Sequence, residues 1–248
     1  MKPHLVRYWL TSVVDQHFDE KVTDINSLYQ QAAELMEQGE AVVSTDELTG
    51  VQALERKHDS LPMKPGYVEF QEFEYIRHGT HSFIINFMVA AGKIGTVSYG
   101  PTRNETDFLN HVQATVAAQP QIRKWHFIVD NLNTHCSQSL VKFVAEESDI
   151  ADDLGVKGQS GILHSMKSRA AFLSDLSHRI VFHYTPNHAS WMNQVEIWFS
   201  ILARKLLRRG NFTSVSDLIN KVLAFISYYN ETMAKPFRWT YQGKALEA

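Results

Sequence analysis

Three acidic residues stand in apolar surroundings and are the first candidates for chemistry in this sequence. Asp46 and Asp130 each follow a short run rich in valine and other strand-forming residues, and Glu196 lies inside an apolar, helix-like segment. A buried ionised carboxylate without a partner costs several kcal/mol or becomes protonated. A metal ion bound by all three residues would keep them ionised.

The ligand chemistry of these acids indicates which metal to expect. Carboxylate oxygens are hard ligands that suit Mg²⁺ or Mn²⁺ rather than zinc. A trio of carboxylates can hold two such ions about 3.5–4 Å apart, where one ion activates the attacking oxygen and the other stabilises the leaving oxygen. Asp46, Asp130 and Glu196 therefore suit a two-metal site that transfers phosphoryl groups.

Structural roles for the same acids stay open at this level. Asp46 and Asp130 can each belong to a turn or cap a helix, as acids after strands often do. Glu196 can pair with a basic residue elsewhere in the chain.

The elements that must position these acids follow from hydrophobic periodicity and from turn residues. A hairpin comes first and strands then alternate with helices, which predicts a mixed sheet with helices packed on it. In such sheets, side chains at strand ends project into a crevice where ligands bind. The expected strands are Ala41–Asp46, Ser82–Val89, Ile94–Tyr99, Lys124–Val129 and Arg179–Tyr184, and the expected helices are Asp24–Met36, Thr102–Ala118, Ser137–Glu147, Met166–Leu173, Trp191–Arg209 and Ser214–Glu231.

Composition indicates an ordinary globular protein, because 44% of the 248 residues are hydrophobic and 21% are charged. Cys136 is the only cysteine, which excludes an internal disulfide and a cysteine-based zinc site. The sequence has no apolar run of membrane-spanning length and no signal-peptide pattern at its start. We therefore expect a cytoplasmic protein with no membrane partner.

Charge is distributed unevenly, although the net charge is only -3. Residues 1–60 hold five Lys and Arg against eleven acids, whereas residues 161–248 hold eleven against five. A basic C-terminal part favours a polyanionic partner, but an ordinary solvated surface explains it equally well.

Other catalytic or metal-binding motifs find little support. His178, His183 and His188 recur every five residues, which places them on no common helix face, and Pro186 interrupts the segment. The sequence contains no Walker A loop, no HExxH motif and no GxSxG motif. Nucleotide hydrolysis, zinc-dependent proteolysis and esterase chemistry are therefore not expected.

Short sequence segments around the three acids resemble those of a known protein family. The strings Val43–Glu47, Ile128–His135 and Tyr184–Trp198 resemble those of transposases from bacterial insertion sequences related to the mariner elements, specifically the six-thirty insertion-sequence family. In that family a strand ends in Asp-Asn with a His nearby, and a later strand leads through a proline loop to Asn-x-x-Glu on a helix. The resemblance covers residues 41–235 and includes all three acids in order.

The resemblance implies an α/β, ribonuclease H-like (integrase/transposase) fold with a mixed sheet and flanking helices. Asp46, Asp130 and Glu196 would form a DDE triad that binds Mg²⁺ or Mn²⁺ and cuts DNA at the element's ends, after which the 3′-hydroxyl attacks target DNA. The implied partners are terminal inverted repeats and target DNA. A homodimer assembled on DNA and a nucleoid-associated location in bacteria are also implied.

Six further residues are candidates for DNA contact in this interpretation. The family places a His near the second acid, which can orient a phosphate or a metal-bound water, or cap a helix. An Asn three residues before the third acid shares its helix face and can position that acid, touch DNA or cap the helix. Basic residues later on the same helix can bind phosphates or complement the helix dipole. These residues are Asn131, His135, Asn193, Arg204, Lys205 and Arg208.

Two departures from the family pattern affect the expected domain organisation. Between Asp130 and Glu196 the spacing exceeds the usual one, and the Gly- and Ser-rich stretch 151–178 is expected to be an insertion outside the sheet. Residues 1–40 resemble the tail of an interdomain linker, so we expect a helical lead-in without the helix-turn-helix module of the family. The catalytic domain would span residues 41–235, followed by a tail at 236–248.

Two other functions stay open because of these departures. A truncated, non-catalytic fragment could bind DNA or a full-length transposase and interfere with it. A ribonuclease H-like nuclease acting on RNA–DNA hybrids would share the same metal site.

Overall fold

The computed structural model describes residues 17–70 and 72–241 and contains one five-stranded sheet. The strands lie in the order β3-β2-β1-β4-β5; β1 pairs antiparallel with β2 and parallel with β4, and the outer pairs are β2–β3 antiparallel and β4–β5 parallel. The predicted mixed sheet is therefore confirmed. Its strands are β1 (Glu40–Arg56), β2 (Tyr75–Met88), β3 (Lys93–Gly100), β4 (Lys124–Val129) and β5 (Ile180–Tyr184).

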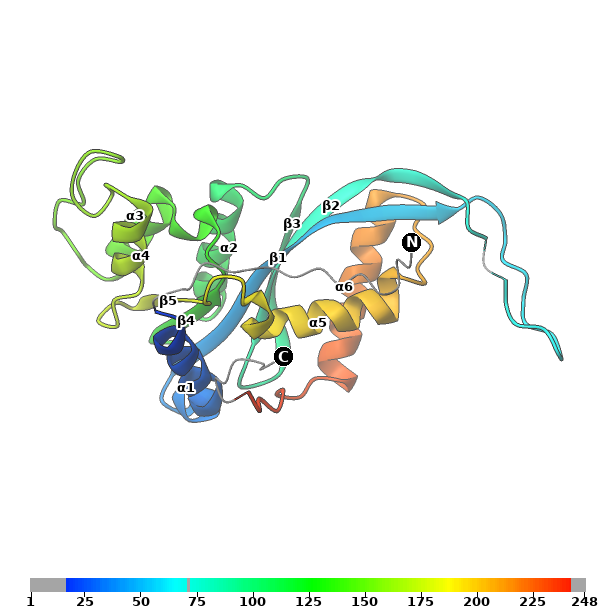
Figure 1. Ribbon diagram of the computed structural model, residues 1–248, viewed down its shortest axis with the longest axis horizontal. Coiled ribbons are helices and arrows are strands. Elements are labelled where there is room, and N and C mark those ends of the chain that lie inside the picture. Colours follow the sequence, from blue (N-terminus) through cyan, green and yellow to red (C-terminus); the bar gives the residue numbers. More distant parts are fainter. Residues whose placement is uncertain (1–16, 71, 242–248) are drawn as a thin grey trace, which may run out of the picture.

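Helices cover both faces of this sheet (Figure 1). Consecutive residues of β1 face opposite sides, so Val42 packs in one hydrophobic cluster and Val43 in the other. The first cluster includes residues of α1, α5 and α6, and the second includes residues of α2, α3 and α4. The helices are α1 (Phe18–Glu37), α2 (Glu105–Ala118), α3 (Gln138–Glu147), α4 (Met166–Leu173), α5 (Gln194–Leu202) and α6 (Val215–Thr232), with short helical turns at η2 (Asn133–Cys136), η3 (Ser190–Met192) and η4 (Ala203–Leu207).

Capping residues explain several helix boundaries that the sequence predicts correctly. The Asn104 side chain accepts hydrogen bonds from the backbone N–H groups of Thr106 and Asp107, and so fixes the start of α2. Ser137 and Ser214 cap α3 and α6 in the same way. The predicted boundaries of β4 and α4 are confirmed to the residue.

Several predicted boundaries are wrong. The first helix begins at Phe18 instead of Asp24, and the second strand begins at Tyr75 instead of Ser82. The first strand does not end at Asp46 but continues to Arg56, because its second half pairs with β2 after its pairing with β4 stops. β1 and β2 therefore form a long arm that extends beyond the helices (Figure 1). The predicted helix over Trp191–Arg209 is divided: α5 begins only at Gln194, and its C-terminal end widens into a π-helical turn.

Residues 151–178, all of which the structure describes, contain α4 but no strand. Three glycines in this segment adopt positive φ, and Gly155 and Gly161 approach each other too closely for side chains. Leu163 and Leu173 are nonetheless buried in the same cluster as residues of α2 and α3. The segment therefore extends the core beside the sheet instead of lying free of it.

No helix in the described part of the chain is long and apolar enough to cross a lipid bilayer.

Gly92, in the turn between β2 and β3, should not tolerate a side chain. Its φ is +64°, and a Cβ atom would lie 2.0 Å from the carbonyl carbon and oxygen of Lys235. Backbone strain and the clash together should lower the free energy of unfolding of Gly92→Ala by about 2–4 kcal/mol in urea denaturation. Gly50→Ala is a matched control, since Gly50 has the same φ but nothing within 4 Å. Equal losses in the two variants would contradict the proposed packing of the chain against Gly92.

Candidate active site

The three acids come together where β4 ends and where β1 stops pairing with it. Asp130 follows β4 directly, and the parallel register that pairs Ser44 with Ile128 brings Asp46 level with Asp130. Glu196 lies in the first turn of α5, which packs against β1. Residues from three separate elements thus share one edge of the sheet.

Burial and repulsion between negative charges raise the pKa values of two of these acids. Burial raises the pKa of Asp46, which is only 7% exposed, to about 7, and the negative charge of Asp130 adds to this shift. Burial also raises the pKa of Glu196, again with a contribution from Asp130, while a hydrogen-bonding interaction with Asp46 opposes the shift. At neutral pH, the carboxyl of Asp46 is therefore partly protonated in the absence of a cation.

The acids do not form a ready-made metal cage. Among residues 17–70 and 72–241, no group of three or more His, Cys, Asp or Glu side chains is arranged to hold a metal ion. The sequence-based expectation of acids already placed to share metals is thus met only in part: the charges interact, but the ligand atoms do not yet converge.

A buried histidine joins Asp130 to a second acid that the sequence analysis missed. The Nδ1 atom of His135 lies 2.8 Å from Oδ1 of Asp130, and its Nε2 atom lies 3.2 Å from Oε1 of Glu47. Burial opposes the charged imidazole, but the two carboxylates outweigh burial and raise the pKa of His135 to about 10. For Asp130, burial acts upward, but His135 outweighs it and lowers the pKa. His135 therefore keeps Asp130 ionised.

This arrangement corrects the prediction that His135 contacts DNA. Its side chain is 0% exposed and both ring nitrogens face carboxylates. Glu47 was overlooked because it follows Asp46 directly and therefore points to the opposite face of the strand. Its carboxylate contacts His135 and its charge also acts on Asp46, and sequence spacing does not reveal the contact with His135.

Asn193 is also buried and corrects a second predicted DNA contact. Its Nδ2 donates to the carbonyl of Thr45 at 2.9 Å and approaches Oδ2 of Asp46 at 3.4 Å, and its Oδ1 accepts from the hydroxyl of Ser44. The same hydroxyl oxygen accepts from the N–H of Val195 at 2.7 Å. Asn193 makes no side-chain cap of α5. Instead it fastens the start of the helix that carries Glu196 to the strand that carries Asp46.

Asn193→Ala should loosen this attachment. The change leaves buried groups on Ser44 and Thr45 without their partner, which should cost about 1–3 kcal/mol of unfolding free energy. Because the relative positions of Asp46 and Glu196 then vary, we also expect any metal-dependent cleavage to fall about 10–100-fold. Thermal denaturation and a cleavage assay measure the two effects. A variant with wild-type cleavage would show that Asn193 does not position the acids.

A second buried network supports β1 from its other face. Asn86 Oδ1 accepts from the hydroxyl of Thr45 at 2.6 Å and lies 2.9 Å from Nε2 of His111. His111 Nδ1 in turn lies 2.8 Å from the hydroxyl of Ser98, and Asn86 Nδ2 donates to Thr115. Burial lowers the pKa of His111 to about 3, so this histidine is neutral and acts through its hydrogen bonds.

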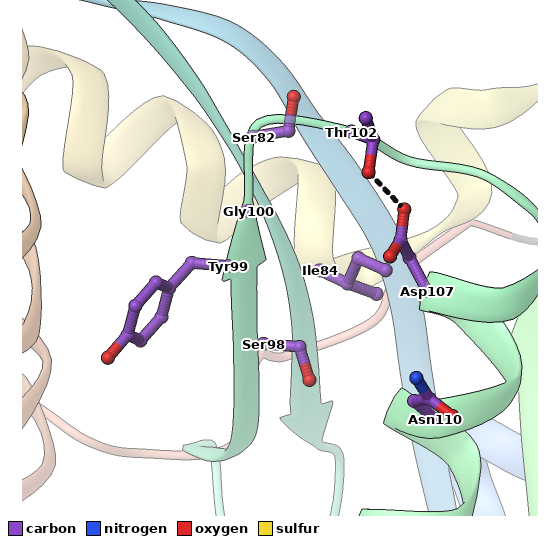
Figure 2. A pocket seen from close by; sticks show the side chains of 8 residues that line it. All are labelled: Ser82, Ile84, Ser98, Tyr99, Gly100, Thr102, Asp107 and Asn110. Atoms are coloured by element: carbon purple, nitrogen blue, oxygen red, sulfur yellow. Dashed lines mark hydrogen bonds between the residues drawn. The ribbon is translucent and has the colours of Figure 1, made fainter.

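A cavity of about 210 Å³ lies between the β2–β3 hairpin and α2 (Figure 2), and its lining residues do not include the three acids. Its lining contains one carboxylate, Asp107, which accepts a hydrogen bond from the Thr102 hydroxyl at 2.7 Å. Asp107 also accepts from the N–H of Asn104 as part of the helix cap. Because this carboxylate is engaged, the cavity does not compete with the acid cluster as a metal site.

Cationic side chains near the site are exposed. Arg204, Lys205 and Arg208 lie at the C-terminal end of α5 and beyond it. Helix geometry places them about 12 Å or more along the axis from Glu196.

Arg103, which the sequence analysis missed, is exposed in the segment before α2. Its charge contributes to the lowered pKa of Asp130. Asn131 donates its amide to the carbonyl of Thr185, so it joins the ends of β4 and β5.

The sheet order, the helices on both faces and the acids at the ends of the central strands define a ribonuclease H-like α/β domain. A family model described as "DDE superfamily endonuclease" matches residues 41–219. The chain therefore belongs to the DDE superfamily endonuclease family. A comparison with curated proteins finds no significant match.

Solved structures share this fold at low sequence identity. The Mos1 mariner paired end complex with Mn matches with a TM-score of 0.53 and 11% identity, over 90% of this chain and 59% of that chain. A pre-cleavage Mos1 transpososome matches with a TM-score of 0.51 and 11% identity, over 90% and 58%. The chain thus spans less than two thirds of the length of the chains in these two complexes.

Proposed function

We propose that this chain is the catalytic core of a DDE transposase, which cuts DNA and joins the cut end to target DNA in a reaction that depends on divalent metal ions. The observation that carries the proposal is the meeting of Asp46, Asp130 and Glu196 at one sheet edge, with charges that repel one another. Membership of the DDE endonuclease family and the likeness of the fold to mariner transposase complexes support it.

The chemistry of the donor set fits Mg²⁺ or Mn²⁺. Asp46, Asp130 and Glu196 offer only carboxylate oxygens, and a divalent cation would offset the burial and repulsion that raise the pKa values of Asp46 and Glu196. We propose that the three residues hold two ions. Bound ions of this kind would activate the attacking oxygen and stabilise the leaving oxygen in phosphoryl transfer.

The other residues of the site position these acids and the substrate. His135 holds Asp130 in its ionised form, and Asn193 fixes the start of α5 against β1. The charge of Arg103 acts on Asp130, and we propose that Arg103 contacts a phosphate next to the acids. We further propose that Arg204, Lys205 and Arg208 bind the DNA backbone, a contact that would make binding depend on salt.

The finer features of the proposal concern partners and organisation. We propose transposon terminal repeats and target DNA as substrates, a homodimer on DNA, and an origin among the six-thirty insertion-sequence transposases of bacteria, with a nucleoid-associated location. The proposed organisation is a helical lead-in at 1–40, a catalytic domain at 41–235 with an insertion at 151–178, and a tail at 236–248. The Mos1 complexes with transposon ends support DNA as the partner class.

A plasmid-nicking assay tests the proposed activity. Supercoiled DNA should be nicked in Mg²⁺ or Mn²⁺, but not in EDTA and not by Asp46→Asn. A labelled RNA–DNA hybrid, added as an alternative substrate, separates a DNA transposase core from a ribonuclease H-like nuclease. Cleavage confined to the RNA strand, or no cleavage of either substrate, would contradict the proposal.

A further inference from the structure

A second cavity, of about 350 Å³, opens directly beside Asp130 between the ends of β4 and β5. Leu132 and Pro186 contribute apolar surface to it, while His188 and Ser190 are exposed polar side chains on its lining. Among the described residues, neither lysine nor arginine lines this cavity. The lining therefore offers a phosphate group no positive side chain, whereas a nucleobase, with apolar faces and a polar edge, fits it.

The backbone at His188 gives an independent reason to examine this cavity. The N–H of Ala189 donates to the carbonyl of Pro186 at 3.1 Å, which closes a tight turn with His188 at its third position. His188 has a φ of +61°, a conformation that glycine adopts without strain and that a histidine adopts only at a cost. Strained backbone of this kind gathers at functional sites, where the side chain contributes more than the strain removes.

We infer that this cavity binds the unstacked base of the nucleotide next to the phosphate that is cut, and that His188 contacts this base. The inference rests on the proposed function, because Asp130 borders both the cavity and the acid cluster. His188 would stack on the base or bind its polar edge, as histidines do with single-stranded bases. It would thereby select which nucleotide lies beside the cleaved bond.

His188→Gly is the informative variant because it removes the imidazole and relieves the backbone strain at the same time. We expect a melting temperature equal to or above that of the wild type. Cut positions mapped on a random-sequence duplex should lose their base preference next to the cleaved phosphate, and cleavage should fall about 10-fold. His188→Asn, which tolerates positive φ, should retain part of the preference if the contact is a hydrogen bond.

Asp149→Gly is the matched control. Asp149 is exposed with a φ of 53° and lines a different cavity, so this variant gains the same relief of strain without touching the inferred base site. It should keep the wild-type cut preference and rate. If His188→Gly also keeps both, the inference is wrong and the proposed function stands.

A DNA-binding measurement under conditions that prevent cleavage tests the base site separately from the proposed function. In EDTA, wild-type protein should bind a duplex with a single-stranded overhang about 10-fold more tightly than the same duplex with abasic overhang positions, as measured by fluorescence anisotropy. His188→Gly should lose most of that difference. If the affinities behave in this way but the wild-type protein cuts no DNA, the base site is supported and the proposed function is wrong. Equal affinity of the wild type for both duplexes would overturn the base site.

Discussion

Glu196→Gln should abolish metal-dependent strand cleavage while leaving the metal-free fold at least as stable as the wild type. Glutamine keeps the shape of the side chain but removes the charge that a divalent cation needs. Loss of a residue that only supports a metal ligand typically lowers activity by about 10–100-fold. Loss of a proposed ligand itself should therefore reduce the cleavage rate by more than about 100-fold.

The stability half of this prediction follows from the electrostatics of the site. Burial and the charge of Asp130 raise the pKa of Glu196, so the ionised form is disfavoured in the folded, metal-free protein. Within residues 17–70 and 72–241, no basic side chain forms an ion pair with Glu196. Removing its charge therefore leaves no buried base unpaired.

Thermal denaturation in EDTA measures this effect beside the nicking assay. If Glu196 belonged to a structural ion pair, glutamine would cost about 3–5 kcal/mol of unfolding free energy. A loss of that size would assign Glu196 to the scaffold and leave the proposed site with two acids. Asn193→Gln is a useful comparison, because it disturbs the attachment of the same helix without changing any charge.

The stability that Asp46 contributes to the metal-free protein should fall as pH rises from about 4 to 8, and divalent metal should reverse this trend. The pKa of Asp46 is about 7 in the fold against an ordinary value of 3.8, so its carboxyl binds more protons in the folded state than in the unfolded state in this range. The lowered pKa of His111 acts in the opposite direction between about pH 3 and 6.5, so the Asp46 effect is measured as the difference between the wild type and Asp46→Asn. The raised pKa of His135 acts in the same direction above its ordinary value of 6.5, until about pH 10.

The size of the effect comes mainly from Asp46, for which about 2–4 kcal/mol should be lost between pH 4 and 8. Asp130 contributes little in this window. Its pKa is lowered, so its ionisation affects stability only at pH values near and below its ordinary pKa of 3.8. A bound cation replaces the proton, so saturating Mn²⁺ should stabilise the protein more at pH 8 than at pH 5.

Urea denaturation at a series of pH values, in EDTA and in Mn²⁺, measures both slopes. Asp46→Asn is the control, since it removes the titrating group but keeps His111, so the stability difference between the wild type and this variant should shrink as pH rises from about 4 to 7. Wild-type and Asp46→Asn stabilities that run parallel across this range would show that Asp46 ionises normally and that the acids do not repel one another.

Interactions between residues that are close in the sequence made many of the helices and strands predictable. Helix caps such as Asn104 and Ser137 act within a few residues, and alternating or continuous apolar runs define strands such as Lys124–Val129. The position of Glu196 within an apolar helical segment and the sequence strings around Asp130 were enough to indicate the acids and the family.

Only the tertiary structure decided how these parts act on one another. The length of β1 depends on pairing with β2, and the ionisation of Asp130 depends on His135 and Glu47, which approach it from another turn and another strand. Asn193 and His135 were expected at the DNA surface but are buried, because their hydrogen-bond partners on β1 are about 150 and 90 residues away in the sequence. Burial and pKa are set by such distant neighbours, and a sequence pattern that reports on local spacing does not contain them.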